Sequence, residues 1–310
     1  MKILITGQTG FLGYFLSSYL ESQNHEVTGI NSQNCDLRNF DKLSNFTNIK
    51  FDEIYHLAAW TQAGDFCLHH PGEQWIINQQ INASILRWWA EIQPQAKLIT
   101  MGTSCSYDPS LDLIEENYLI GTPIESLYTY AHTKRMMEIG LRSLSNQFNL
   151  KYLTVVPSTL YGPQYHLDGR QMHFIFDLIR KIMLGKYRGD EVVLWGDGHQ
   201  ERELVFIDDF INDLVALNST ASNEIFNIGA NTSHTIREFA EQISSIIGFD
   251  NNKIKYDTSK YVGAKSKSLK NYKLINTIGE LHRTSIEDGL TKTIDWFENN
   301  FDKFLAENNE

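Results

Sequence analysis

The turn between the first predicted strand and the first predicted helix constrains the fold more than any other feature. Residues 2–6 form an apolar run typical of a strand, and residues 11–23 have helical periodicity. The glycines between them follow the spacing G-x-x-G-x-x-G rather than the commoner G-x-G-x-x-G. Glycines at such a turn let the backbone approach a pyrophosphate, which then lies at the helix N-terminus. We therefore expect a dinucleotide site formed by Gly7, Thr9, Gly10, Phe11, Leu12 and Gly13.

The first half of the chain alternates short apolar runs with helical stretches, which is typical of a parallel sheet covered by helices. After Gly162 this rhythm loosens and the elements become shorter. The pattern predicts an α/β fold, with a doubly wound parallel sheet and a smaller C-terminal α/β lobe. Strands are predicted at 2–6, 25–30, 52–57, 97–101, 151–156, 192–195 and 225–228, and helices at 11–23, 73–92, 126–148, 172–184, 208–217, 236–247 and 285–301.

These elements divide into two domains, and the chain passes between them more than once. Residues 1–165, together with about 195–222, are expected to form the dinucleotide-binding domain. Residues of about 166–194 and 223–310 are expected to form the smaller lobe, which binds the substrate.

The composition excludes several classes of protein. The 310 residues include 27 lysines and arginines against 38 aspartates and glutamates, a formal net charge of −11 that disfavours non-specific binding to nucleic acid or anionic membranes. No apolar run approaches the roughly 20 residues of a membrane span, and the N-terminus lacks a signal-peptide pattern. Cys35, Cys67 and Cys105 form no C-x-x-C pair. We expect a cytoplasmic protein without a metal site.

A tyrosine and a lysine are the candidate acid–base pair. Tyr130 and Lys134 are four residues apart in a predicted helix, so they share one helix face. A phenol with a pKa of about 10 is a poor acid–base group at neutral pH, but an ammonium one turn away lowers that pKa. Thr103 and Ser104 follow a predicted strand, at the end of the strand where α/β sheets bind ligands. These residues predict proton transfer beside a nicotinamide ribose that Lys134 can hydrogen-bond.

The end of the second predicted strand bears on the choice between NAD(H) and NADP(H). An acidic residue there would bind the ribose 2′-hydroxyl of NAD. This chain has Asn31 instead, so no carboxylate repels a 2′-phosphate. Asp36 and Leu37 are expected to meet the adenine, and Arg38 is the nearest cation. We favour NADP(H), with NAD(H) as the alternative.

These motifs resemble those of the extended short-chain dehydrogenases/reductases, the NAD-dependent epimerase/dehydratase family. The resemblance covers nearly the whole chain, including H-L-A-A at 56–59, P-S-T-L-Y-G-P at 157–163 and the stretch 195–209. It implies a Rossmann-like sheet and a C-terminal lobe that binds nucleotide sugars. It also implies Thr103, Tyr130 and Lys134 as the catalytic triad. Further cofactor contacts are implied at Leu57, Ala58, Ala59, Pro157, Thr159 and Leu160.

Within this family, the chain is similar to members that epimerise C3 and C5 of a GDP-linked 4-keto-6-deoxyhexose and then reduce C4, for surface polysaccharides. The run G-T-S-C-S-Y at 102–107 and the run 195–203 carry this similarity. The epimerisation pair of such enzymes falls on Cys105 and His173. Inversion needs a base on one face and an acid on the other. A homodimer is implied, through the helices 73–92 and 126–148. The implied substrate contacts are Thr103, Ser104, Thr159, Lys181, Trp195, Arg202 and Lys267.

Alternatives stay open at this point. Cys105 can be a small buried hydrophobe and His173 a packing residue, which would leave a single-function C4 reductase or epimerase of another nucleotide-diphosphate sugar, such as a GDP-linked heptose. A dinucleotide-sensing regulator without catalysis is the other alternative. The segments 60–73, 164–168 and 265–267 depart from the family pattern. These departures leave the identity of the sugar open.

Overall fold

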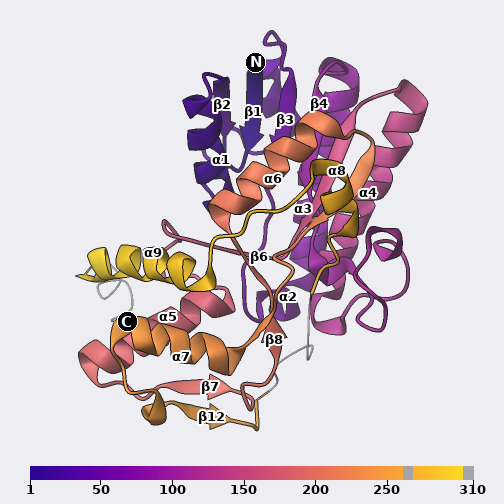
Figure 1. Ribbon diagram of the computed structural model, residues 1–310. Coiled ribbons are helices and arrows are strands. Elements are labelled where there is room, and N and C mark those ends of the chain that lie inside the picture. Colours follow the sequence, from indigo (N-terminus) through magenta and orange to yellow (C-terminus); the bar gives the residue numbers. More distant parts are fainter. Residues whose placement is uncertain (261–267, 303–310) are drawn as a thin grey trace.

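Six parallel strands form the central sheet of the computed structural model, which describes residues 1–260 and 268–302 (Figure 1). Their order across the sheet is β10-β5-β4-β3-β1-β2, and all five neighbouring pairs are parallel. β1, β3, β4, β5 and β10 are largely buried, as expected where helices cover a parallel sheet, whereas the edge strand β2 is buried only at Ile30. Their bounds are β1 (Lys2–Thr6), β2 (Glu26–Ile30), β3 (Glu53–His56), β4 (Lys97–Met101), β5 (Tyr152–Pro157) and β10 (Glu224–Ile228).

The carboxyl ends of β1 and β3 mark where the strand order reverses. β1 lies between β2 and β3, and Thr6 is level with both Ile30 and His56. The chain continues from β1 to β2 on one side and from β3 to β4 on the other. Ligands of open α/β sheets bind in the crevice at such a reversal. The fold therefore places the glycine turn, which follows β1, at the expected binding edge.

Helices cover both faces of the sheet and build most of the smaller lobe (Figure 1). They are α1 (Phe11–Ser22), α2 (Phe66–His69), α3 (Pro71–Ile92), α4 (Tyr128–Phe148), α5 (Phe174–Arg188), α6 (Ile207–Thr220), α7 (Ile236–Ile247), α8 (Tyr272–Ile278) and α9 (Ile286–Asn299). On one face α1, α6 and α8 pack around Leu16 and Phe210. On the other face α3 and α4 run side by side and bury Trp88 and Trp89. No helix in the described ranges is long and apolar enough to cross a membrane.

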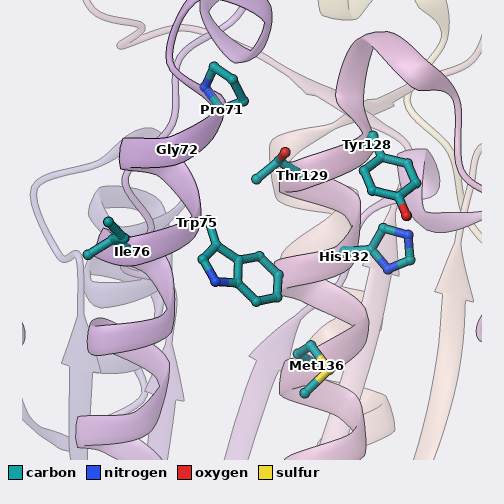
Figure 2. A pocket seen from close by; sticks show the side chains of 8 residues that line it. All are labelled: Pro71, Gly72, Trp75, Ile76, Tyr128, Thr129, His132 and Met136. Atoms are coloured by element: carbon teal, nitrogen blue, oxygen red, sulfur yellow. The ribbon is translucent and has the colours of Figure 1, made fainter.

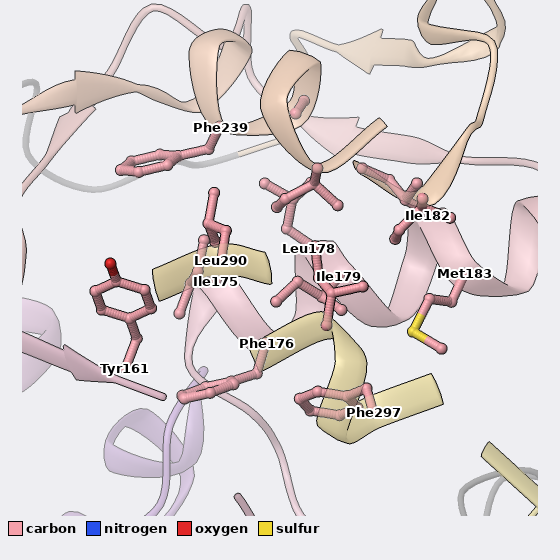
Figure 3. Packing of buried hydrophobic residues seen from close by; sticks show 14 of the residues in the cluster. Tyr161, Ile175, Phe176, Leu178, Ile179, Ile182, Met183, Phe239, Leu290 and Phe297 are labelled. Carbon is pink, nitrogen blue, oxygen red and sulfur yellow. The ribbon is translucent and has the colours of Figure 1, made fainter. Parts of the chain in front are cut away.

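The smaller lobe has its own hydrophobic core between α5, α7 and α9 (Figure 3). Phe176, Phe239 and Phe297, one from each helix, are fully buried there. Short strand pairs border the lobe: β7 with β12, β8 with β11, and β6 with β9. Their bounds are β6 (Thr159–Tyr161), β7 (Val193–Trp195), β8 (Glu201–Arg202), β9 (Leu204–Phe206), β11 (His234–Thr235) and β12 (Lys255–Asp257).

The α/β fold expected from the sequence is confirmed, and every predicted strand and helix is present with small shifts at its ends. Two placements differ. We expected residues from 223 onward in the smaller lobe, but β10 pairs with β5 and extends the main sheet, and α8 packs against α6 and β10. The physical reason is that Ile225, Phe226 and Ile228 are all buried, which suits a strand covered by helices on both faces. The rest of the domain division stays a prediction.

Candidate active site

The glycine turn packs so closely against neighbouring backbone that Gly7 and Gly13 leave no room for a side chain. Gly7 has a φ of +70°, and a Cβ there would lie 2.9 Å from the backbone nitrogen of Ala58. A Cβ on Gly13 would lie 2.3 Å from the carbonyl oxygen of Gly7. Gly10 donates its N–H to that same oxygen at 3.0 Å and precedes α1, whose first turn carries no acidic side chain. This cradle at a helix N-terminus fits a pyrophosphate.

The side chains around this turn do not all face a ligand. Thr9 is exposed, and Ala58 and Ala59 are half-buried. Phe11 packs edge-on against Tyr165, with 5.5 Å between ring centres, and therefore joins the main sheet domain to the smaller lobe. Leu12 packs against the core beside the sheet, as does Leu57. A cofactor contact from Phe11 or Leu12 is therefore a backbone contact.

Beyond β2, Arg38 and Asp36 form a bidentate ion pair. Arg38 Nε donates to Asp36 Oδ1 at 2.9 Å and Nη2 donates to Oδ2 at 2.6 Å. These bonds hold the pKa of the Asp36 carboxyl below its usual range, and half of the Arg38 side chain stays exposed. Asn31 accepts a bond from the backbone nitrogen of Gln33 at 2.8 Å. The Leu37 side chain is buried in the core, which leaves its backbone for a contact at this edge.

Tyr130 and Lys134 lie one turn apart on α4, as predicted. Lys134 Nζ lies 5.8 Å from the centre of the Tyr130 ring. Burial lowers the pKa of Lys134 to about 8. We expected the lysine to lower the pKa of Tyr130, and that expectation is wrong for the protein alone. Burial instead raises the pKa of Tyr130, and negative charge on Cys105 adds to the effect.

Thr103 and Cys105 follow β4, and Cys105 lies within electrostatic range of Tyr130. Thr103 Oγ1 accepts the backbone N–H of Cys105 at 3.3 Å, which starts a short 3₁₀ helix at Ser104–Ser106. Thr103 and Cys105 are both half-buried. The thiol and the phenol thus lie near each other beyond the carboxyl end of β4, and the Thr103 hydroxyl is bonded to the same short turn as the thiol.

Cys67 is a neighbour of this group that the sequence did not identify. It lies on α2, 6% exposed, and accepts a bond from Gln74 Nε2 at 3.3 Å. It is within electrostatic range of both Cys105 and Tyr130, and burial raises its pKa. Its only sequence signal was its place in the segment 60–73, which departs from the family pattern. In the described part of the chain, no three histidine, cysteine or carboxylate side chains gather as metal ligands.

His173 stands at the position just before α5. Its backbone N–H donates to Tyr165 Oη at 3.4 Å. The imidazole is open to solvent, yet protein surrounds it densely enough to lower its pKa below the ordinary value. This combination is typical of a side chain in the wall of a cleft. His166 is nearby, and burial lowers its pKa to about 4.

Three of the expected substrate contacts line one hollow. Ser104, Thr159 and Arg202 surround a space of about 20 Å³ together with Ser158 and Glu203. Arg202 Nη1 donates to the carbonyl oxygen of Glu201 at 2.7 Å. Burial lowers the pKa of Arg202, and negative charge on Cys105 acts in the opposite direction. The structure therefore brings Arg202 from β8, Ser104 from the loop after β4 and Thr159 from β6 to one place. Pro157 and Leu160 flank it on β5 and β6.

Lys181 and Trp195 lie together in the smaller lobe. Lys181 Nζ lies 5.9 Å from the centre of the Trp195 ring and 3.0 Å from Asp177 Oδ2. Arg180 pairs with the same carboxylate at 2.6 Å. Trp195 is 57% exposed, so it does not fill the core of the lobe. Lys267 lies outside the described residues.

A second hollow lies between α3 and α4, on a face with no expected site residue (Figure 2). Its volume is about 560 Å³. Trp75, Ile76, Tyr128 and Met136 are each more than 40% exposed here. The residues that line it are Pro71, Gly72, Trp75, Ile76, Tyr128, Thr129, His132 and Met136.

Comparison with known proteins confirms the family resemblance. The model of the NAD dependent epimerase/dehydratase family matches residues 3–229. GDP-L-colitose synthase of Yersinia pseudotuberculosis is 28% identical over 309 residues, with 96% of this chain and 98% of that protein covered. GDP-L-fucose synthase of Dictyostelium discoideum is 27% identical, with 97% and 96% covered. The crystal structure of a GDP-L-fucose synthetase from Naegleria fowleri bound to NADP has the same fold, with a TM-score of 0.87, 23% identity and 97% and 93% covered.

Proposed function

The chain belongs to the NAD dependent epimerase/dehydratase family, and from this premise we propose that it is an NADPH-dependent 3,5-epimerase and 4-reductase of a GDP-linked 4-keto-6-deoxyhexose. The names of its curated relatives, a GDP-L-colitose synthase and a GDP-L-fucose synthase, support a GDP-sugar. The single observation that carries the double activity is the grouping of Cys105 with Tyr130 at the sheet edge. A reductase alone needs the phenol but not the thiol.

The cofactor would lie along the sheet edge. Gly7, Gly10 and Gly13 let the backbone fold tightly at the N-terminus of α1, where its pyrophosphate would lie. NADP(H) is favoured over NAD(H) because the end of β2 carries Asn31 rather than an acid, with Arg38 close by. Bound NADPH supplies the hydride that C4 of the sugar accepts. The other proposed contacts are Thr9, Phe11, Leu12, Asp36, Leu37, Leu57, Ala58, Ala59, Tyr130, Lys134, Pro157, Thr159 and Leu160.

For epimerisation, Cys105 would remove the proton next to the ketone and His173 would return one from the other face. Protons at C3 and C5 are acidic because the 4-ketone delocalises the resulting negative charge. The nucleophilic and basic form of a cysteine is the thiolate, and the half-buried cation of Arg202 lies within the electrostatic range of Cys105. His173 would take up a proton from solvent and deliver it to the enolate carbon, and its lowered pKa favours that release. Cys105 would lose the proton that it removed to solvent and return to the thiolate.

For reduction, Tyr130 would donate its proton to the oxygen at C4 while the hydride arrives. Burial raises its pKa, so the phenol holds that proton at neutral pH. Thr103 would hold the same oxygen by a hydrogen bond and steady the enolate in the epimerisation steps. Lys134 would orient Tyr130 and the nicotinamide ribose. One position of the oxygen thus serves both reactions.

The nucleotide part of the substrate would lie against the smaller lobe. Arg202 suits a pyrophosphate because its guanidinium makes bidentate contacts. Lys181 and Trp195 present a cation and an open ring side by side, for a phosphate and a base respectively. Ser104 and Thr159 offer hydroxyls to the sugar from the same hollow as Arg202. Lys267 is a further phosphate candidate by its position in the sequence.

A homodimer would bury the exposed face of α3 and α4 (Figure 2). Aromatic and methionine side chains are enriched in protein interfaces, and Trp75, Tyr128 and Met136 supply them here. We propose a cytoplasmic location because Cys35, Cys67 and Cys105 form no C-x-x-C pair and no even-numbered framework.

The experiment that tests the substrate measures NADPH oxidation with a panel of nucleotide-linked 4-keto sugars. GDP-4-keto-6-deoxymannose should be turned over faster than the same sugar on UDP or dTDP. Turnover of a GDP-linked 4-keto heptose alone would favour the single-function C4 reductase instead. Cofactor binding without turnover of any member would favour the non-catalytic regulator.

A further inference from the structure

Arg135 directly follows Lys134 on α4 and is buried. Within the part of the chain that the structure describes, its side chain donates hydrogen bonds to backbone carbonyl groups and to no side chain. It is 5% exposed. Its Nε donates to the carbonyl oxygen of Ser106 at 2.9 Å, and Nη2 donates to the same oxygen. Nη2 also donates to the carbonyl oxygen of Ile120 at 2.8 Å, and Nη1 donates to that of Gly121 at 2.7 Å. One guanidinium therefore binds three carbonyl groups of a single loop.

That loop begins at the candidate site and returns to α4. Ser106 directly follows Cys105, and its hydroxyl donates to the carbonyl oxygen of Ala131 on α4 at 3.2 Å. At the far end, Asp108 Oδ2 accepts the backbone N–H of Thr122 at 2.8 Å, which closes the loop upon itself. Arg135 thus ties the start and the end of the loop to the helix that carries Tyr130.

The chemistry of arginine suits this task. Its planar fork presents five donors in fixed directions, whereas lysine presents three donors on one atom. Together, the three side-chain nitrogens of Arg135 bind the carbonyl groups of Ser106, Ile120 and Gly121. Ser106 is buried, and a carbonyl group left without a donor in a buried place costs free energy, so its carbonyl oxygen depends on the two bonds from Arg135. Lysine at 135 would reach only part of this set.

We propose that Arg135 is a positioning residue, which fixes Thr103 and Cys105 on the loop relative to Tyr130 and Lys134 on the helix. It acts through these residues and not on the substrate itself. The inference rests on the proposed function for the roles of those four side chains. Misplacement of reacting groups by about 1 Å can cost roughly 100-fold in rate, so small loop movements would be measurable.

The test compares Arg135→Met and Arg135→Lys with Arg87→Met, a control that removes an exposed arginine from the neighbouring helix α3. All are measured as full-length protein, with thermal melting to establish that each is folded. For folded Arg135→Met we expect kcat to fall roughly 100-fold while the Kd for NADPH changes less than about 3-fold. The kcat of Arg135→Lys should lie between the kcat of Arg135→Met and that of the wild type.

A second readout needs no substrate. Iodoacetamide alkylates the thiolate of Cys105, and peptide mass spectrometry separates this from Cys35 and Cys67. We expect the pH profile of Cys105 alkylation to shift in Arg135→Met and in Arg135→Lys but not in Arg87→Met, because the loop moves Cys105 relative to Tyr130 and Arg202.

The proposal is overturned if a folded Arg135 variant keeps both kcat and Cys105 alkylation within about 3-fold of the Arg87→Met control. If Arg135→Met does not fold, Arg135→Lys decides by the same two measurements. If the wild-type enzyme turns over no 4-keto sugar, the proposed function fails, and the alkylation profile still decides whether Arg135 positions Cys105.

Discussion

Gln171 and Asp65 exchange two hydrogen bonds between distant segments of the chain. The backbone N–H of Asp65 donates to Gln171 Oε1 at 3.1 Å, and Gln171 Nε2 donates to Asp65 Oδ1 at 2.7 Å. The other carboxylate oxygen of Asp65 bonds to His69 Nε2 at 3.2 Å. Asp65 is two residues before Cys67, and Gln171 is two residues before His173. The two hydrogen bonds therefore connect the segment that carries Cys67 to the segment that carries His173, the candidate acid.

Gln171→Glu should slow epimerisation more than it affects cofactor binding. A second carboxylate beside Asp65 replaces a donor with a like charge, which pushes the two segments apart. We expect solvent-deuterium exchange at C3 and C5 of the 4-keto sugar to fall about 10-fold, because His173 loses its position. Gln164→Glu, at an exposed position of the same segment, is the control. Equal exchange rates in the two variants would show that the bridge does not position His173.

Gly13→Ala should abolish tight cofactor binding. Its Cβ would lie 2.3 Å from the carbonyl oxygen of Gly7 and 2.7 Å from Gln8 Cα, and neither backbone atom can yield without opening the turn. Gly72→Ala is the control, since a Cβ there meets nothing within 4 Å. Fluorescence titration with NADPH measures the effect. An unchanged Kd in folded Gly13→Ala would contradict the assignment of the turn to the pyrophosphate.

Lys134→Met should flatten the pH dependence of stability. Burial holds the folded pKa of Lys134 at about 8, below its unfolded value of 10.5. Between these values the unfolded chain binds more protons, so the free energy of unfolding rises with pH through this window. Below pH 8 the folded protein bears the full cost of the buried charge, and the variant should gain about 3 kcal/mol there.

Urea unfolding of wild type and Lys134→Met at pH 7 and pH 9 measures this difference. Lys97, whose pKa burial also lowers to about 8, is present in both proteins and cancels in the comparison. An identical rise in stability for both proteins would mean that Lys134 is not buried as a cation.

Trp75→Glu should convert a dimer into monomers. The side chain is 41% exposed in the single chain and lines the hollow between α3 and α4, where a charge would oppose burial. Tyr14→Glu, at an aromatic residue that is 49% exposed on α1, is the control. Sedimentation velocity measures the mass of each. A wild-type monomer, or a Trp75→Glu dimer, would contradict the proposed interface.

Local patterns were enough to predict the sheet, the helices and the family. Strand and helix periods are short-range signals, and the glycine turn needs only seven residues to be recognised. Spacing alone also placed Tyr130 and Lys134 on one helix face. The edge strand β10 was assigned to the wrong lobe because pairing with β5 is a long-range contact that periodicity does not report.

The parts of the candidate site that the sequence missed depend on tertiary packing. Cys67 reaches the neighbourhood of Cys105 through the placement of α2. Arg135 looks like an ordinary exposed helix residue until the loop carbonyls of Ser106 and Gly121 fold onto it. The direction of the Tyr130 pKa shift differs from the sequence-based expectation because burial of the phenol raises this pKa.

The most direct test of the central claim is NMR of the product formed from GDP-4-keto-6-deoxymannose and NADPH in deuterated water. If both acid–base exchanges and the hydride transfer take place at this site, the product is a reduced sugar with deuterium at both C3 and C5. A reduced sugar that keeps its original protons at C3 and C5 would contradict the claim, because Cys105 and His173 would then have moved no protons.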